Sequence, residues 1–140
     1  MKVVRWSFSL VVLSLLLAAC RAPATPATSS SGQLLTPVSF VRSGGFAGQT
    51  NQVQIEVDGS TIVTRNDGST ETGQLTPSQT QELASLLAGS GLFDADHSFE
   101  TPGADQFVYT ITYNGHMVTA IDGAIPEELA GVIDFLAALL

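Results

Sequence analysis

The side chains best suited to chemistry in this 140-residue chain are two histidines and two nearby carboxylates. Asp94 and Asp96 precede His97, whereas His116 stands apart, beside a turn sequence. Zinc sites use histidines or cysteines at short, regular spacing, and neither histidine has such a partner. We therefore expect no metal site. A weak cation site at Asp94 and Asp96 is the alternative to an exposed acidic loop, which we favour.

Nucleophilic and nucleotide-binding patterns are also missing. Ser43 has no neighbouring histidine, and the chain has no Gly-x-Ser-x-Gly elbow. The glycines Gly44, Gly45 and Gly48 do not match a dinucleotide-binding loop, and no helical pattern follows them. The sequence predicts no catalytic residues and no cofactor, so we expect a protein that is not an enzyme.

Cys20 is the only cysteine of the chain, and its surroundings predict its chemistry. Lys2 and Arg5 precede an apolar run over Val11–Leu17, the pattern of a secretory signal. Leu17-Ala18-Ala19-Cys20 resembles the bacterial lipobox, in which the cysteine thiol is lipidated and cleavage leaves it as the first residue. The alternative is an ordinary cleaved signal with a chance cysteine.

These features divide the chain into three parts. We expect a lipoprotein signal peptide over residues 1–19. A lipidated Cys20 and a flexible tether rich in Pro, Ala, Ser and Thr follow over residues 20–36. One α+β domain occupies residues 37–140. The protein would be exported and held to a membrane by its lipid. Arg21 replaces the aspartate of inner-membrane retention, so that membrane is the outer one in a Gram-negative cell. It is otherwise the outer face of the plasma membrane.

The exported part is strongly acidic. Without Lys2 and Arg5 it carries three arginines against 13 acidic residues, a net charge of −10. No cluster of basic residues is available to neutralise phosphates, which excludes nucleic acid as an expected partner. The acidic residues are dispersed, as on an ordinary solvated surface. The oligomeric state is left open.

The first half of the domain has the alternation of an antiparallel sheet. We expect a short strand at Val38–Val41, a second at Val53–Asp58 and a third at Thr61–Thr64. Asp58-Gly59 and Asn66-Asp67-Gly68 are turn signals.

Two helices and a second hairpin follow. Thr76, Pro77 and Gln79 predict a capped helix start, Leu83, Leu86 and Leu87 form its apolar face, and Gly89 and Gly91 end it. Phe107–Tyr113, Asn114-Gly115 and Met117–Ile121 predict a hairpin, and a last helix begins at Pro126. Its apolar stripe consists of Leu129, Val132, Ile133, Leu136 and Leu140. The order ββ(β)-α-ββ-α predicts an α+β fold: a small antiparallel sheet with two helices packed on one face.

The most distinctive segment of the domain is the glycine-rich stretch Arg42–Gly48. Its glycines permit backbone conformations that other residues avoid. Phe46 is its one bulky apolar side chain, either a plug for the core or an anchor for a partner's pocket. Composition alone favours the plug.

Four motifs, in this order, resemble the emfourin family of metallopeptidase inhibitors. They are the opening strand with Arg42–Gly48, the end of the first helix at Ser90-Gly91-Leu92-Phe93, Gly103–Tyr109, and Asp122–Pro126. The resemblance spans residues 37–140. It implies a compact α+β protein that binds and blocks a thermolysin-like or protealysin-type zinc peptidase.

The resemblance also implies a binding site. Its partner-binding residues would be Arg42, Ser43, Gly44, Gly45, Phe46, Ala47 and Gly48. Phe46 would supply the large apolar side chain that such peptidases prefer, and Arg42 would pair with an acidic cleft rim or, as we favour, with Asp105 inside the domain.

The chain departs from the family in its anchor and in the segment Asp58–Gly73, which looks like an insertion forming an extra strand. The alternative function is therefore a non-enzymatic envelope lipoprotein that binds another protein through the same fold.

Overall fold

The computed structural model of the chain describes residues 32–100 and 103–140. The expectations for the signal peptide, Cys20 and most of the tether fall on residues 1–31 and lie outside the described residues. The elements are β1 (Val38–Gly44), β2 (Gln49–Ile55), β3 (Ser60–Thr64), β4 (Thr70–Gln74), α1 (Pro77–Ser90), β5 (His97–Phe99), β6 (Phe107–Tyr113), β7 (His116–Ile121) and α2 (Glu127–Ala137).

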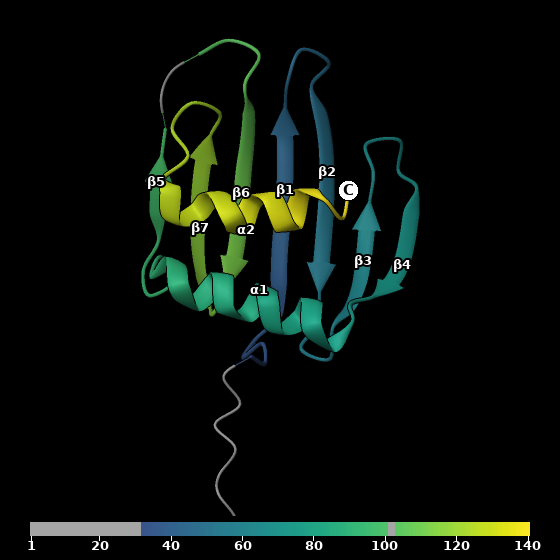
Figure 1. Cartoon of the computed structure of the whole chain (residues 1–140). Coiled ribbons are helices and arrows are strands. Elements are labelled where there is room, and N and C mark those ends of the chain that lie inside the picture. The colour runs from purple at the N-terminus through teal and green to yellow at the C-terminus, as the bar shows by residue number, and fades with distance from the viewer. Residues whose placement is uncertain (1–31, 101–102) are drawn as a thin grey trace, which may run out of the picture.

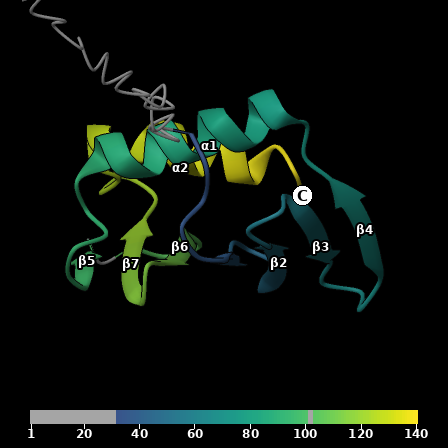
Figure 2. The ribbon, with the colours of Figure 1, turned by 90° about the horizontal axis from the view of Figure 1, so that it is seen from below.

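The strands form one sheet with the order β4-β3-β2-β1-β6-β7-β5. Both helices lie across the same face of this sheet, and the other face is open (Figures 1 and 2). The predicted α+β class and its helices on one face are thus confirmed. The sheet differs from the prediction in being mixed, because β5 pairs with β7 in parallel.

The core fills the space between the helices and the covered face of the sheet. Phe40 on β1 and Ile111 on β6 are fully buried, as are Leu83 of α1 and Leu129 of α2. The predicted stripe of α2 is confirmed for Leu129, Val132, Ile133 and Leu136, which are buried. Leu140 is half-buried but lies beyond the end of α2 at Ala137. Among the described residues, neither helix is long and apolar enough to cross a membrane.

The start of α1 follows the predicted capping box. The Gln79 backbone N–H donates to Thr76 Oγ1 at 3.3 Å, and the Thr76 N–H donates to Gln79 Oε1 at 2.9 Å. The expected stop at Gly89 was wrong, because Gly89 lies inside the helix. Gly91, with φ +63°, provides the left-handed residue that ends it.

Four of the expectations for the strands also differ from the structure. β1 continues to Gly44, so Arg42 and Ser43 belong to a strand that pairs on both sides. β2 begins at Gln49 and ends at Ile55, before the Asp58 turn. The segment expected to give one extra strand gives β3 and most of β4. His97, expected in a loop, begins β5.

The residues before β1 are tied to the end of the sheet where β6 turns into β7. Leu34 is buried, the Leu35 N–H donates to Tyr113 Oη at 3.2 Å, and the Asn114 N–H donates to Thr36 Oγ1 at 2.9 Å. The β1–β2 turn lies at the opposite end of the sheet (Figure 1). The seven residues of β1 separate these two ends by roughly 20 Å.

Candidate functional site

The tip of the β1–β2 hairpin carries the most exposed large apolar side chain among the described residues. Phe46 is 93% exposed, which overturns the core plug that composition favoured. The reason is topological: β1 and β2 extend past the helices, so their turn projects beyond the core (Figure 1). An aromatic ring held in water at a loop tip is suited to a partner's pocket.

The turn itself is compact and depends on glycine. The Gly48 N–H donates to the Gly45 carbonyl at 3.0 Å, so Phe46 and Ala47 are the central residues of a β-turn. Gly44, Gly45 and Gly48 have φ of +110°, +69° and +58°. A Cβ at Gly44 would collide with the Gln106 backbone oxygen, and one at Gly45 would lie 2.8 Å from the Phe107 ring. The hairpin therefore packs closely against β6 at its base.

Asp122, the residue after β7, accepts hydrogen bonds from β6, the strand that packs against the base of this turn. Its Oδ2 accepts from the Phe107 N–H at 3.1 Å, and its Oδ1 accepts from Tyr109 Oη at 2.8 Å. Its backbone oxygen accepts from Gln106 Nε2. The Gln106 backbone oxygen in turn accepts the Gly45 N–H at 3.0 Å. A chain of hydrogen bonds thus runs from Asp122 to the turn that carries Phe46.

Three of the four motifs behind the family resemblance meet at this end of the sheet. They are the Arg42–Gly48 segment, the start of β6 within Gly103–Tyr109, and Asp122 of the acidic turn. The sequence placed each motif but did not identify Asp122, Gln106 and Tyr109 as the support of the hairpin. The acidic turn immediately after a strand was the available signal.

Arg42 does not form the internal ion pair with Asp105 that the sequence favoured. Within residues 32–100 and 103–140, no ion pair includes Arg42 or Asp105. The Arg42 guanidinium carbon instead lies 5.1 Å from the centre of the Phe107 ring, a cation–π contact. Its Nε is buried without a hydrogen-bond partner in the described part of the chain. The Arg42 side chain therefore packs against β6 at the base of the hairpin rather than at its tip.

Removing the Asp122 carboxylate should loosen this support. Asp122→Ala leaves the Phe107 N–H and the Tyr109 hydroxyl without acceptors in a half-buried position. We expect the free energy of unfolding to fall by about 2 kcal/mol. Chemical denaturation of the wild-type and variant domains measures the difference. Asp134→Ala, on α2, is the matched control for charge, and a fall of equal size there would contradict the role given to the hydrogen bonds.

The same network makes the stability of the fold depend on pH in the alkaline range. Burial, assisted by the hydrogen bond and charge of Asp122, raises the pKa of Tyr109 to about 12. The folded protein keeps the phenol proton at pH values where the unfolded chain, with a tyrosine pKa of 10.0, releases it. This contribution is complete below pH 10 and is lost as the pH rises towards 12. Between pH 10 and pH 12, the melting temperature of Tyr109→Phe should fall less steeply with pH than that of the wild type. Equal slopes for the two proteins would contradict the role given to Tyr109.

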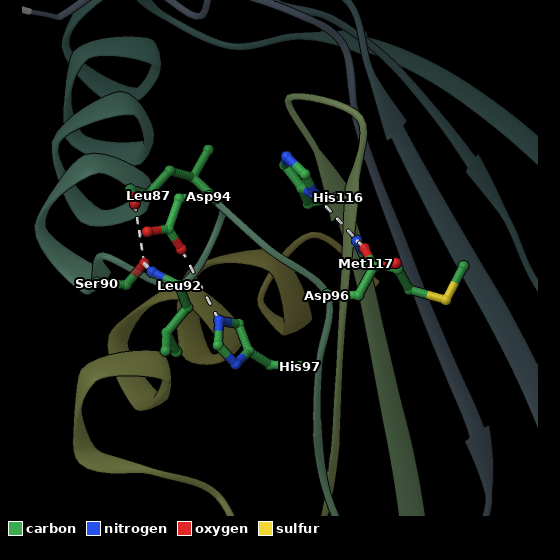
Figure 3. Close-up of polar contacts among 8 residues, drawn as sticks. All are labelled: Leu87, Ser90, Leu92, Asp94, Asp96, His97, His116 and Met117. Carbon is green, nitrogen blue, oxygen red and sulfur yellow. Dashed lines mark hydrogen bonds and ion pairs between the residues drawn. The ribbon is translucent and has the colours of Figure 1, made fainter.

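The histidines and acidic residues that opened the sequence analysis lie elsewhere, at the β5 edge of the sheet. His97 Nε2 lies 3.9 Å from Asp94 Oδ1, and His116 Nδ1 lies 3.7 Å from Asp96 Oδ1 (Figure 3). Asp96 Oδ1 also accepts the Met117 N–H at 2.8 Å. These are two separate pairs. The described residues contain no group of three potential ligands that could hold a metal ion.

One hollow of the described surface, at the β5 edge, is lined by Asp96 and His97, which belong to the two separate pairs above. Another, of about 460 Å³ between the start of α1 and the β2–β3 turn, has Asp58 as its only ionisable lining residue. That carboxylate already accepts from the backbone N–H and the hydroxyl of Ser60. The fold and this site define a small α+β domain that presents an exposed hairpin, with no assembled catalytic group in the described part of the chain.

Comparison with known families gives that class a specific identity. The emfourin family model matches residues 40–137, and the chain belongs to the emfourin family. Emfourins are metallopeptidase inhibitors rather than enzymes. No curated protein matches the sequence.

Proposed function

We propose that this protein inhibits a thermolysin-like zinc metallopeptidase by placing Phe46 in the substrate cleft. The single observation that carries the proposal is the 93% exposure of Phe46 on a turn whose base is fixed by hydrogen bonds. Membership of the emfourin family supplies the class of target. Because the backbone of the turn is already held by hydrogen bonds, it loses little conformational entropy on binding, which favours tight binding.

The shape of the turn explains how such an inhibitor avoids cleavage. Phe46 and Ala47 lie inside a tight turn closed by the Gly48-to-Gly45 hydrogen bond. A peptidase cleaves a segment that can lie extended across its catalytic groups, and this turn cannot extend without breaking that bond. The hydrogen bond from the Gly45 N–H to the Gln106 backbone oxygen also resists the opening.

The turn also lacks a side chain that could bind the catalytic zinc. Arg42–Gly48 contains no histidine, cysteine or carboxylate. Inhibition would therefore result from filling the subsite and excluding substrate, not from capture of the metal by a side chain. The zinc-free peptidase should accordingly bind the domain with an affinity similar to that of the zinc enzyme.

The proposed lipid anchor at Cys20 is compatible with this site. The described chain enters the domain at Leu34–Thr36, at the end of the sheet opposite the Phe46 turn. A tether emerging there leaves the turn directed away from the membrane. Replacing Cys20 by serine should then move the protein from the membrane fraction to the soluble exported fraction. Unchanged fractionation would overturn the anchor without affecting the inhibitor proposal.

Titration of the fragment Gln33–Leu140 against thermolysin and a protealysin-type enzyme tests the inhibitor proposal. All buried core residues in the described part of the chain lie between Leu34 and Leu136, so the fragment contains the core that the structure describes. Nanomolar inhibition supports the proposal. A folded, uncut fragment without inhibition favours the alternative, an envelope lipoprotein that binds another protein. Rapid cleavage within the turn would show that the segment is a substrate.

A further inference from the structure

Strand β4 forms one edge of the sheet and leaves part of its backbone unpaired. It pairs with β3 alone, and all five of its residues are exposed. Hydrogen bonds from Arg65 N to the Ser69 oxygen and from Leu75 N to the Gly59 oxygen, both 2.9 Å, flank the pairing. Because antiparallel ladders alternate, Glu71 and Gly73 direct their backbone groups to β3. Thr70, Thr72 and Gln74 direct theirs outward.

This edge lacks the features that usually prevent pairing with another chain. β4 has no proline, no lysine and no bulge. Its one ionisable residue, Glu71, is already paired with Arg65 of the same chain at 3.0 Å. The opposite edge, β5, is only three residues long, and Asp96 and Glu100 stand directly before and after it. Of the two edges, β4 is the one open to extension.

We propose that β4 pairs antiparallel with β4 of a second copy of this chain, with Thr72 on the two-fold axis. Thr72 then faces Thr72 of the second copy, and Thr70 faces Gln74 of the second copy. Glu71 faces Gly73 of the second copy, so no like charges are directly opposed. A shift of the axis to Glu71 would place two carboxylates opposite each other, which costs stability. The side chains thus disfavour the register centred on Glu71 and are compatible with the one centred on Thr72.

The helix side of the same edge offers a second complementary feature. The missing side chain at Gly73 contributes to a hollow of about 150 Å³, with Thr61, Val63 and Leu139 among its lining residues. In the proposed register, Glu71 of the second copy stands over Gly73. Its methylene groups would cover this hollow while its carboxylate stays in water. On the open face of the sheet, the residues that pair across the interface are Thr70, Thr72 and Gln74. They are uncharged and continue the surface around Ile62.

A contact through one short strand buries little area, so we expect a weak, reversible dimer. Sedimentation equilibrium of the fragment Gln33–Leu140 up to millimolar concentration should detect it. Thr72→Pro removes the outward N–H and should weaken dimerisation at least about tenfold. Thr72→Val keeps that N–H and should dimerise like the wild type. A monomeric wild-type fragment, or a dimer that persists in Thr72→Pro, would overturn the proposal.

Cross-linking provides a test that does not depend on the proline variant. The fragment has no cysteine, so Thr72→Cys introduces a single thiol on the proposed axis. Directly opposed Cβ atoms lie about 5 Å apart, within reach of a short bis-maleimide. Thr70→Cys and Ile62→Cys place exposed thiols off the axis and should cross-link much more slowly. Equal rates for the three variants would contradict the register. None of these outcomes depends on peptidase inhibition.

Discussion

Replacing Phe46 by alanine is expected to weaken inhibition by at least ~2 kcal/mol, about 30-fold in the inhibition constant. A fully desolvated aromatic anchor contributes this much because its burial in the partner's pocket is lost on truncation. The melting temperature should not change, since the side chain is 93% exposed and its removal opens no cavity. Inhibition titrations and thermal melts of the wild-type and Phe46→Ala forms of the fragment Gln33–Leu140 measure both quantities.

Leu35→Ala is the matched control for this substitution. Leu35 is also a large exposed apolar residue, at 76%, but it lies at the opposite end of the sheet. Its truncation should leave the inhibition constant unchanged. Equal losses for Leu35→Ala and Phe46→Ala would indicate a general effect of surface hydrophobicity. Full inhibition by Phe46→Ala would remove Phe46 from the site.

Local signals in the sequence predicted much of the fold. The Asp58-Gly59 and Asn114-Gly115 turns lie between paired strands where expected, and both adopt the positive φ that such turns require at glycine. The Thr76 capping box likewise depends only on residues within one helical turn. These features are encoded by neighbours in the chain, so they can be read without tertiary structure.

Features that depend on distant residues were missed. β5 is only three residues long and pairs in parallel with β7, which requires a partner far along the chain. The end of α1 is instead a local feature that was only partly predicted, because Gly89 was expected to end the helix together with Gly91. Ser90 explains the observed end: its buried hydroxyl donates to the Leu87 carbonyl and accepts the Leu92 N–H, so the chain turns at Gly91 (Figure 3).

The candidate site shows the same division between local and distant information. The glycine spacing of Arg42–Gly48 predicted an unusual loop, and the three positive φ values agree with it. Composition did not decide whether Phe46 is buried, because that depends on how far the hairpin extends past the helices. The Arg42 side chain packs against the Phe107 ring of β6, whereas the sequence suggested the Asp105 carboxylate as its partner.

Gly44→Ala should be the most damaging glycine substitution in the β1–β2 turn. Gly44 has φ +110°, which a residue with a side chain rarely adopts, and its Cβ would collide with the Gln106 backbone oxygen. Because that oxygen accepts the Gly45 N–H, the collision forces β1 away from β6 at the base of the turn. We expect a loss of about 3 kcal/mol in unfolding free energy, measured by chemical denaturation, together with weaker inhibition.

Gly48→Ala separates backbone strain from the collision. Gly48 also has a positive φ, +58°, but a Cβ there meets no atom within 4 Å. It should therefore cost only about 1 kcal/mol, the usual penalty of the left-handed region. Gly44→Ala should lose more inhibition than Gly48→Ala although both retain Phe46, because only the first displaces the base of the hairpin. Similar losses would mean that the contact with Gln106 does not position the turn.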